Sequence, residues 1–535
     1  SSVELKDPTT FTLIGKKLSR KDIGKTNGTA VFTQDIQLPD MLTAVVAHPP
    51  RFGAVLVDFD ATETKKLPGV VDVVRIDNAV AVLALTFWQA KKGRDLLSIN
   101  WNEDSAFEQS SDTLFAHYHQ LAESPGTVAK QVGDVEPAFK AAANIVEASY
   151  EFPFLAHAAM EPLNCVVQIK ADQVEIWNGC QFQTSDQQIV ANFLGVKPDQ
   201  VKINTLLAGG SFGRRANPQA DYVLEAVRIA KAYGKRVPIK LVWTREDDTH
   251  AGYFRPMYVH KLKAGLDKQG NIIAWQHRIV GQSIAAGTAF EAIVKEGIDP
   301  MSVEGAANLP YQIPNLSVEL HTVDLPVPVL WWRSVGSTHT AHSTETFIDH
   351  LAAATQQDPL AFRLKLLKDY PAHQKVLQLA ADKAQWGTPL AEGRAKGIAV
   401  HKSFGTTVAQ VAEVSVEKDG NFRVEKVTCA VDCGLAVNPD VVAAQMEGGI
   451  GFGLSPTLLS EITFKNGQVV QSSFHDYQVV RMSHMPQVDI HIVPSSESPT
   501  GVGEPATPVI APAVENALYA ATGVSRTHLP FGLKV

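Results

Sequence analysis

The stretch TGVGEPATPVIAPAVENALYAATG, Thr500–Gly523, lies near the C-terminal end of a chain of 535 residues. Its first half holds a single acid, Glu504, between Gly503 and Pro505 in a segment that is otherwise small and apolar. Further apolar residues then recur at helical spacing, namely Val514, Ala517, Leu518 and Ala521. This periodicity predicts a helix from Pro512 onward that packs into the core behind the acid.

The isolated carboxylate has two interpretations. As a charge on a surface loop, Glu504 needs no function. In a segment that buries itself, loss of water disfavours the ionised form and raises the proton affinity of the carboxylate. A general base requires such a group, so Glu504 is a candidate for removing a proton from a bound reactant.

A second feature is the glycine-rich stretch LLAGGSFGRRANPQADYVLEA, Leu206–Ala226. We expect a strand before Gly209, Gly210 and Gly213 and a helix after them, an arrangement whose exposed N–H groups bind anions. A tight turn that needs glycine for its backbone freedom is the alternative. The spacing is not G-x-G-x-x-G, and no Lys-Ser/Thr pair follows, which disfavours nicotinamide binding and nucleotide hydrolysis.

Two further motifs carry weaker signals. In PVPVLWWRSVGSTHTAHSTE, Arg333 follows two tryptophans, so it is either a guanidinium presented into an aromatic cleft or an ordinary salt-bridged arginine. In DCGLAVNPDVVAAQMEGGIGFGLS, five glycines follow a strand. They permit either close approach of a ligand to the backbone or tight packing between helices.

His157 and Glu161 in LAHAAMEPLNC are four residues apart, the spacing of one helical face. Pro153 and Pro162 bracket the segment closely, and a further ligand at suitable spacing is missing. We therefore expect a structural, hydrogen-bonded histidine at position 157 and no metal site.

Composition excludes several classes of protein. Hydrophobic residues make up 45% and charged residues 19%, with a net charge of −8, so a basic surface for nucleic acid is not expected. The longest apolar runs are far shorter than the roughly 18 residues of a membrane span. The 4 cysteines form no CxxC pair and are expected to be buried small hydrophobes. The length predicts about three or four domains.

The motifs GGSFGRR, WWRSVG, AVDCGLAVNPDVVAAQMEGGIGFGL and GVGEPATPVIAPAVENALYAATG occur in this order. Together they resemble the molybdenum-binding large subunit of the xanthine oxidase and aldehyde oxidoreductase family, in its isoquinoline 1-oxidoreductase beta-subunit type. The resemblance runs from about Lys21 to Pro530. It implies an α+β, multi-domain fold with the following parts: an extended lead-in at 1–20, an a/b hammerhead domain at 21–110, a connector at 111–139, and molybdopterin-binding domains at 140–390 and 391–535.

The resemblance also implies the reaction. A molybdenum hydroxylase oxidises an aldehyde to a carboxylic acid, or hydroxylates an N-heteroaromatic ring, with oxygen from water. Molybdopterin cytosine dinucleotide holds the metal through its own dithiolene, so no side chain of this chain is expected as a metal ligand. Electrons are expected to leave through [2Fe-2S] clusters on a small partner subunit, because this chain lacks the cysteines for them. A cytochrome c subunit is a candidate final acceptor.

Mapped by motif, Glu504 is the implied catalytic base, and Arg333 orients the substrate or stabilises developing negative charge. The implied cofactor contacts are Gly209, Gly210, Ser211, Phe212, Gly213, Arg214, Gln445, Gly448, Gly449 and Gly503. Phe254, Trp331 and Trp332 suggest an aromatic-lined entrance for flat or alkyl substrates, although buried packing explains them equally well.

The sequence departs from the family in two places. Leu155 stands where many relatives have a glutamine, so a hydrogen bond to the metal's oxo ligand is lost or is supplied elsewhere. A Gly-Gln-Gly segment of the second cofactor domain is missing, and in the isoquinoline type it stands before the hammerhead domain. We expect an upstream fragment or a separate chain to carry it, together with a twin-arginine export signal that directs the protein to the periplasm.

Two alternatives remain at this point. A non-catalytic scaffold could keep the fold and lose the site, but the retained Glu504 and GGSFG argue against it. A nicotinamide-dependent dehydrogenase is disfavoured by the missing G-x-G-x-x-G.

Overall fold

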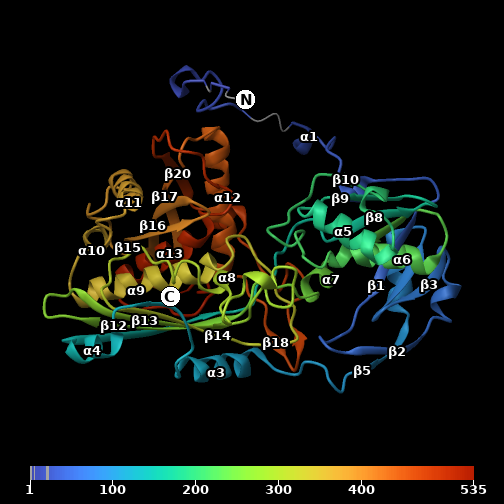
Figure 1. The fold of residues 1–535 in the computed structure, drawn as a ribbon, viewed down its shortest axis with the longest axis horizontal. Coiled ribbons are helices and arrows are strands. Elements are labelled where there is room, and N and C mark those ends of the chain that lie inside the picture. The colour runs from blue at the N-terminus through green and yellow to red at the C-terminus, as the bar shows by residue number, and fades with distance from the viewer. Residues whose placement is uncertain (1–2, 5, 20–22, 535) are drawn as a thin grey trace.

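The computed structural model describes residues 3–4, 6–19 and 23–534 and shows the expected mixture of helices and strands (Figure 1). Three sheets and the helices packed on them form the bulk of the chain. In the part of the chain that is described, no helix is both long and apolar enough to cross a membrane. All four cysteines are buried and free, as expected for small hydrophobes.

The first sheet has seven strands and joins segments far apart in the sequence. Its order is β10 (Val201–Thr205), β9 (Val174–Asn178), β8 (Asn164–Ile169), β11 (Ile239–Val242), β1 (Leu42–Ala47), β4 (Ala79–Ala84) and β3 (Val70–Ile76). β1 pairs parallel with β11, with Leu42 opposite Ile239. Strands of segment 21–110 thus share a sheet with strands of segment 140–390. The helices α5 (Gln183–Leu194) and α6 (Asp221–Tyr233) pack on this sheet.

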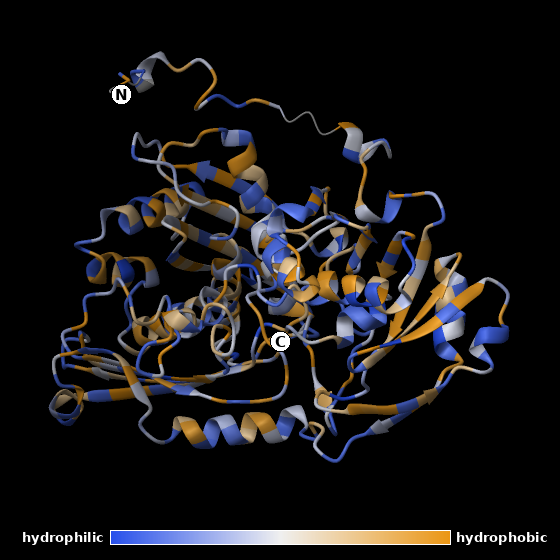
Figure 2. Cartoon of the chain, turned by 45° about the vertical axis from the view of Figure 1, so that its right-hand side comes forward, coloured by the Kyte–Doolittle hydropathy of each residue, from blue (hydrophilic) through white to orange (hydrophobic). Residues whose placement is uncertain are grey.

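The second sheet has five strands, in the order β6 (Thr127–Val132), β14 (Leu316–Thr322), β13 (Ile272–Gly281), β12 (Tyr258–Leu266) and β7 (Asn144–Phe152). The helix α9 (Ser337–Ala354) covers one face, while α3 (Ser111–Ala122) and α4 (Val135–Ala141) cover the other (Figure 1). In Figure 2, α3 alternates hydrophobic and hydrophilic residues, and its Leu114 and Tyr118 are buried. An amphipathic helix of this kind packs on a sheet through one stripe.

The third sheet positions the C-terminal motif. Its order is β15 (Arg394–Ser403), β16 (Thr406–Val416), β17 (Phe422–Asp432) and β20 (Gln487–Ile492). The helices α12 (Pro439–Leu458) and α13 (Thr507–Thr522) pack against each other, and α13 lies on β15 and β16. A Cβ on Gly397 would lie 2.1 Å from the Ala517 nitrogen, so this glycine lets α13 approach β15.

The remaining elements are short. Two small sheets pair β2 (Val55–Asp60) with β5 (Ser98–Asn102) and β18 (Phe464–Lys465) with β19 (Gln468–Val469). The other α-helices are α1 (Ile23–Thr26), α2 (Phe87–Asp95), α7 (Arg245–His250), α8 (Pro300–Val303), α10 (Pro359–Leu366) and α11 (Pro371–Lys383). The 3₁₀ turns are η1 (Pro8–Thr10), η2 (Thr33–Asp35), η3 (Thr64–Lys66), η4 (Pro198–Gln200), η5 (Glu291–Ile293) and η6 (Met482–His484).

Two helix starts differ from those expected. The helix behind Glu504 begins at Thr507 and includes Pro512, because the whole segment is buried against its neighbours and packing outweighs one lost backbone hydrogen bond. The helix after the glycine loop begins only at Asp221, since Ala220 has a left-handed φ of 50° that interrupts the backbone before it. The expected anion site at a helix start directly behind the glycines is therefore wrong.

Candidate functional site

The glycine loop 209–213 follows β10 and has a conformation that requires glycine. Gly210 and Gly213 have φ values of 107° and 109°, which other residues rarely adopt. Phe212, between them, has a φ of 59°. A Cβ on Gly213 would lie 2.6 Å from the Trp331 carbonyl oxygen. The loop thus approaches Trp331 so closely that only glycine fits there.

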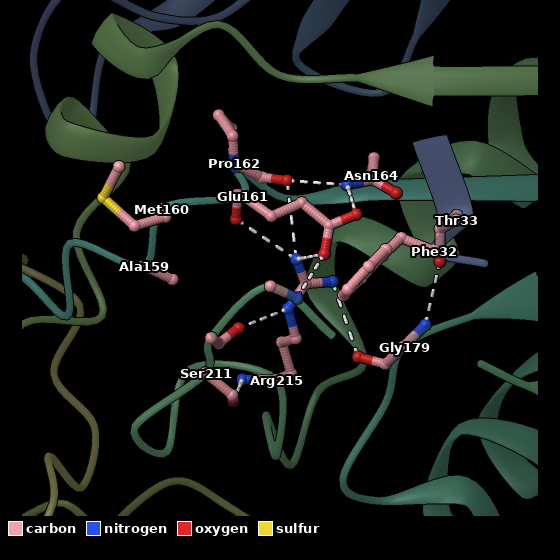
Figure 3. Close-up of polar contacts among 12 residues, drawn as sticks. Phe32, Thr33, Ala159, Met160, Glu161, Pro162, Asn164, Gly179, Ser211 and Arg215 are labelled. Atoms are coloured by element: carbon pink, nitrogen blue, oxygen red, sulfur yellow. Dashed lines mark hydrogen bonds and ion pairs between the residues drawn. The ribbon is translucent and has the colours of Figure 1, made fainter. Parts of the chain in front are cut away.

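A buried ion pair supports this loop from behind (Figure 3). The Arg215 guanidinium lies 3.2 Å from the Glu161 carboxylate and donates a 3.1 Å hydrogen bond to the Gly210 carbonyl. Glu161 also accepts the Gly209 N–H at 2.7 Å and an amide hydrogen bond from Asn164 at 3.0 Å. The sequence analysis missed this support. Its signal was two charges, Glu161 and Arg215, inside short apolar segments.

Two of the expected cofactor contacts are engaged by the protein itself. The Arg214 guanidinium pairs with Asp221 at 2.6 Å and lies 4.6 Å from the centre of the Tyr253 ring. It therefore points toward the start of α6. The Ser211 hydroxyl accepts the Arg215 N–H at 3.0 Å and also contacts Gln181. Contacts of Ser211 and Arg214 with a cofactor remain predictions.

An aromatic stack joins the glycine loop to the WWRSVG and α12 segments. Phe452 of α12 stacks on Phe212 with 4.1 Å between ring centres, and on Trp332 with 4.4 Å. Each such contact contributes about 0.5–1.5 kcal/mol beyond the buried area. The Trp331 indole N–H adds a 3.2 Å bond to the Gly213 carbonyl. Phe452 was not among the predicted site residues, although its motif was.

His157 has the structural role expected of it. It is buried, and its Nε2 lies 2.8 Å from the Trp331 carbonyl oxygen. Burial lowers the pKa of His157 to about 3, so the ring is neutral and Nε2–H donates to this carbonyl. His157 therefore helps to fix the tryptophan that contacts the glycine loop.

Glu504 lies against the turn that begins at Arg333. The Ser334 N–H donates to Glu504 Oε1 at 3.1 Å, and the Ser334 hydroxyl donates to the Glu504 carbonyl at 2.6 Å. The Arg333 Nε–H donates to the Gly503 carbonyl at 2.8 Å, and its Nη2 lies 3.2 Å from Gln445 Oε1. Four predicted residues from three distant segments therefore meet here.

The surroundings of Glu504 favour a proton acceptor. Burial raises the pKa of Glu504 above the ordinary value of a carboxyl, while the Ser334 N–H and the Arg333 charge partly oppose this rise. The side chain is half-buried and hydrogen-bonded. The interpretation of Glu504 as a free surface charge is therefore not supported.

The glycines of α12 divide into two groups. A Cβ on Gly449 would lie 2.9 Å from Ala506 Cβ, and one on Gly453 would lie 2.5 Å from the Thr507 carbonyl. These two glycines serve the packing of α12 on α13. A Cβ on Gly448 would meet only Arg333 at 4.0 Å, and one on Gly503 would meet no atom within 4 Å. Gly448 and Gly503 thus border open space beside Glu504.

This open backbone fits a cofactor that lies close to the main chain. Gly448 and Gly503 leave room that side chains would fill, and Gln445 offers a side-chain amide beside them. Among the described residues, no group of three or more His, Cys, Asp and Glu side chains could hold a metal ion. The residues present therefore fit a metal whose ligands come from the cofactor itself.

We expect opposite outcomes for alanine at Gly453 and at Gly448. Gly453→Ala forces a methyl group against the α13 backbone and should lower the free energy of unfolding by about 1–3 kcal/mol. Gly448→Ala is the matched control in the same helix and should raise helix stability by up to about 1 kcal/mol. Thermal unfolding of both variants measures this. Equal stability of the two variants would contradict the packing role of Gly453.

The aromatic residues near the site also divide into two groups. Phe254 and Trp332 are buried in the core, so their expected place at an entrance is wrong. Trp331 is only partly buried and forms a group with Phe182 and Phe290, whose ring centres lie 6.1 Å and 5.5 Å from it. Phe182 and Phe290 stack nearly parallel, at an interplanar angle of 10°. This aromatic group lies next to Gly213 through Trp331.

Comparison with known proteins identifies the site. Molybdopterin cofactor-binding domains match residues 118–367 and 354–486. Over 99% of its length the chain is 32% identical to the beta subunit of isoquinoline 1-oxidoreductase from Brevundimonas diminuta, of which it spans 69%. Over 99% of its length it is also 30% identical to the membrane-bound aldehyde dehydrogenase [pyrroloquinoline-quinone] of Gluconacetobacter polyoxogenes, of which it spans 73%.

The fold agrees with these relatives. Quinoline 2-oxidoreductase from Pseudomonas putida 86 superimposes with a TM-score of 0.82 over 97% of both chains, at 15% identity. The α+β multi-domain architecture expected from the order of the motifs is thereby confirmed. The domain boundaries stay predictions. The chain belongs to the xanthine oxidase family of molybdenum hydroxylases, as a molybdenum-binding oxidoreductase subunit.

Proposed function

We propose that this chain hydroxylates an electron-poor ring carbon of an N-heteroaromatic compound, with Glu504 as the base. The observation that carries the proposal is the Glu504 carboxylate, which the Ser334 N–H holds beside Arg333 and the open backbone of Gly448 and Gly503. The glycine loop 209–213 and Gln445 complete the surface that would hold the cofactor. When bound, the molybdenum cofactor supplies the redox chemistry and accepts the two electrons that leave the substrate.

The residues of the chain have separate tasks in this reaction. Glu504 Oε2 is the oxygen that accepts a proton, because Oε1 already accepts the Ser334 N–H. The raised pKa of Glu504 makes this transfer more favourable than to an ordinary carboxylate. Arg333 places a positive charge beside the same space and stabilises negative charge that develops on the substrate.

The aromatic group of Phe182, Phe290 and Trp331 supports a flat substrate. Its rings are partly exposed and lie beside the glycine loop, where they can stack on a planar heterocycle. Two relatives are named for isoquinoline and for nicotinate, both of which are N-heteroaromatic. Aldehyde oxidation is the second candidate, since another relative is named an aldehyde dehydrogenase.

Metal analysis and a substrate comparison test the proposal together. We expect about one molybdenum per chain and no pyrroloquinoline quinone. With an artificial electron acceptor, isoquinoline-type rings should give at least a tenfold higher kcat/KM than aliphatic aldehydes, because only they stack on the aromatic group. Purified protein that is active with pyrroloquinoline quinone and contains no molybdenum would overturn the assignment. A preference for aldehydes would leave the chemistry and change the substrate class.

The finer details are proposed on the family resemblance. We propose the cytosine dinucleotide form of the cofactor, a small [2Fe-2S] partner subunit, a cytochrome c as final acceptor and a periplasmic location. Two of the relatives are themselves named as single subunits of an oxidoreductase and of a dehydrogenase, which supports a complex of several chains. Release of CMP on acid hydrolysis and iron analysis of the co-purified complex test the first two.

A further inference from the structure

A second carboxylate holds the turn that orients Glu504. The Gly336 and Ser337 N–H groups donate to Glu304 Oε1 at 2.7 Å and 3.3 Å. On the other side, the Ser334 N–H donates to Glu504 Oε1 at 3.1 Å. The short turn 334–337 therefore lies between two glutamates that come from distant parts of the chain. Glu304 follows α8, and its carboxylate caps the first turn of α9.

The conformation of this turn depends on such support. Ser334 and Val335 have left-handed φ values of 82° and 49°, and a β-branched residue such as valine rarely adopts this region. Strained backbone of this kind persists only where its surroundings fix it. A Cβ on Gly336 would lie 1.9 Å from the Met301 carbonyl, so segment 301–304 closes tightly on the turn.

A further contact ties Glu304 to the same helix. The Thr340 hydroxyl lies 2.7 Å from the Glu304 carbonyl and 3.1 Å from the Gly336 carbonyl. Both the backbone and the side chain of Glu304 are thus bound to the start of α9. Loss of the carboxylate would free the Gly336 and Ser337 N–H groups in a buried region, where unpaired donors are unfavourable.

We propose that Glu304 is a positioning residue of the reaction, because its carboxyl fixes the turn through which Ser334 orients Glu504. The proposal rests on the proposed role of Glu504 as the base. It assigns Glu304 no contact with substrate or cofactor.

The charge of Glu304 is coupled to the site. The groups that face it are Glu504, Asp299 and Tyr258, with the neutral His401 beside Gly305. Burial, with smaller contributions from Glu504 and Asp299, raises the pKa of Glu304 to about 7, while the Gly336 and Ser337 N–H groups oppose the rise. Glu304 is therefore mostly neutral at pH 5 and mostly charged above pH 8. When charged, it increases the proton affinity of Glu504.

The sign of the effect on stability follows from this shift. A carboxyl whose pKa is higher in the folded state stabilises the fold at low pH, and this contribution is lost as pH rises through about 7. Glu304→Gln keeps an oxygen that accepts the two N–H groups but cannot ionise. The Tm of this variant, measured relative to that of the wild type, should therefore be higher at pH 8 than at pH 5.

The test compares Glu304→Gln, Glu304→Ala and the exposed control Glu392→Gln in the purified holoenzyme. Hydrogen exchange of peptide 331–340 should be at least tenfold faster in Glu304→Ala than in the wild type or in Glu304→Gln. Turnover of Glu304→Ala should fall at least tenfold in kcat with little change in KM, and Glu304→Gln should restore most of it. The inflection of the pH profile near 7 should disappear in Glu304→Gln.

Wild-type exchange and an unchanged pH profile in both Glu304 variants would overturn the proposal. If Glu304→Ala does not fold, the pH dependence of Tm and of turnover in Glu304→Gln decides alone. Failure of the proposed function is recognised separately, because it would appear as turnover in Glu504→Gln. The exchange and Tm readouts for Glu304 do not depend on that result.

Discussion

Glu504→Gln should abolish turnover while molybdenum stays bound at the wild-type ratio. Glutamine has nearly the same shape, and its oxygen can still accept the Ser334 N–H. It cannot accept a proton at neutral pH, so the loss should reach or exceed the roughly 10²–10⁴-fold that general bases contribute. Steady-state turnover and metal analysis of the same preparation measure the two quantities.

The control for this variant is Glu497→Gln, which removes an exposed acid from the same C-terminal segment. It should change neither turnover nor metal content. Substantial remaining activity in Glu504→Gln would refute the role of Glu504. Loss of molybdenum from that variant would instead show that the carboxylate is needed to retain the cofactor.

Arg215→Met should destabilise the protein and reduce its molybdenum content. The substitution leaves Glu161 buried without its ion-pair partner and removes the donor to the Gly210 carbonyl. Breaking a buried pair by removing one partner costs about 3–5 kcal/mol. Thermal unfolding should therefore shift to lower temperature, and the glycine loop should lose the support that holds it near Trp331.

Two comparisons make this prediction specific. Arg236→Met removes an exposed arginine and should leave Tm and metal content unchanged. The double variant Arg215→Met with Glu161→Leu should recover part of the stability, because no buried charge is then left unpaired. Wild-type stability of Arg215→Met would contradict the support role of the ion pair.

The sequence contained the site residues but not their neighbours. Glu504, Arg333, Gln445 and Gly503 were predicted from motifs, and the structure brings them into hydrogen-bonding distance. Ser334 lay inside a quoted motif without a role, since its bond to Glu504 joins residues 170 positions apart. Periodicity and local spacing describe neighbours along the chain and carry no signal for such contacts.

The errors at the two helix starts have the same origin. Pro512 is a strong local signal for a helix start, yet burial of the preceding turn extends α13 to Thr507. The single seven-stranded sheet also depends on a distant pairing, that of β1 with β11. Strand composition predicted both strands as buried but could not say that they are neighbours.

The most direct test of the central claim is single-turnover reduction of the cofactor in Glu504→Gln. The oxidised holoenzyme is mixed anaerobically with excess isoquinoline-type substrate, and the absorbance of its redox centres is followed without an external acceptor. This measurement isolates the chemical step from electron transfer to a partner. We predict rapid bleaching in the wild type and none in the variant with full molybdenum occupancy. Bleaching of the variant at the wild-type rate would contradict the assignment of Glu504 as the base.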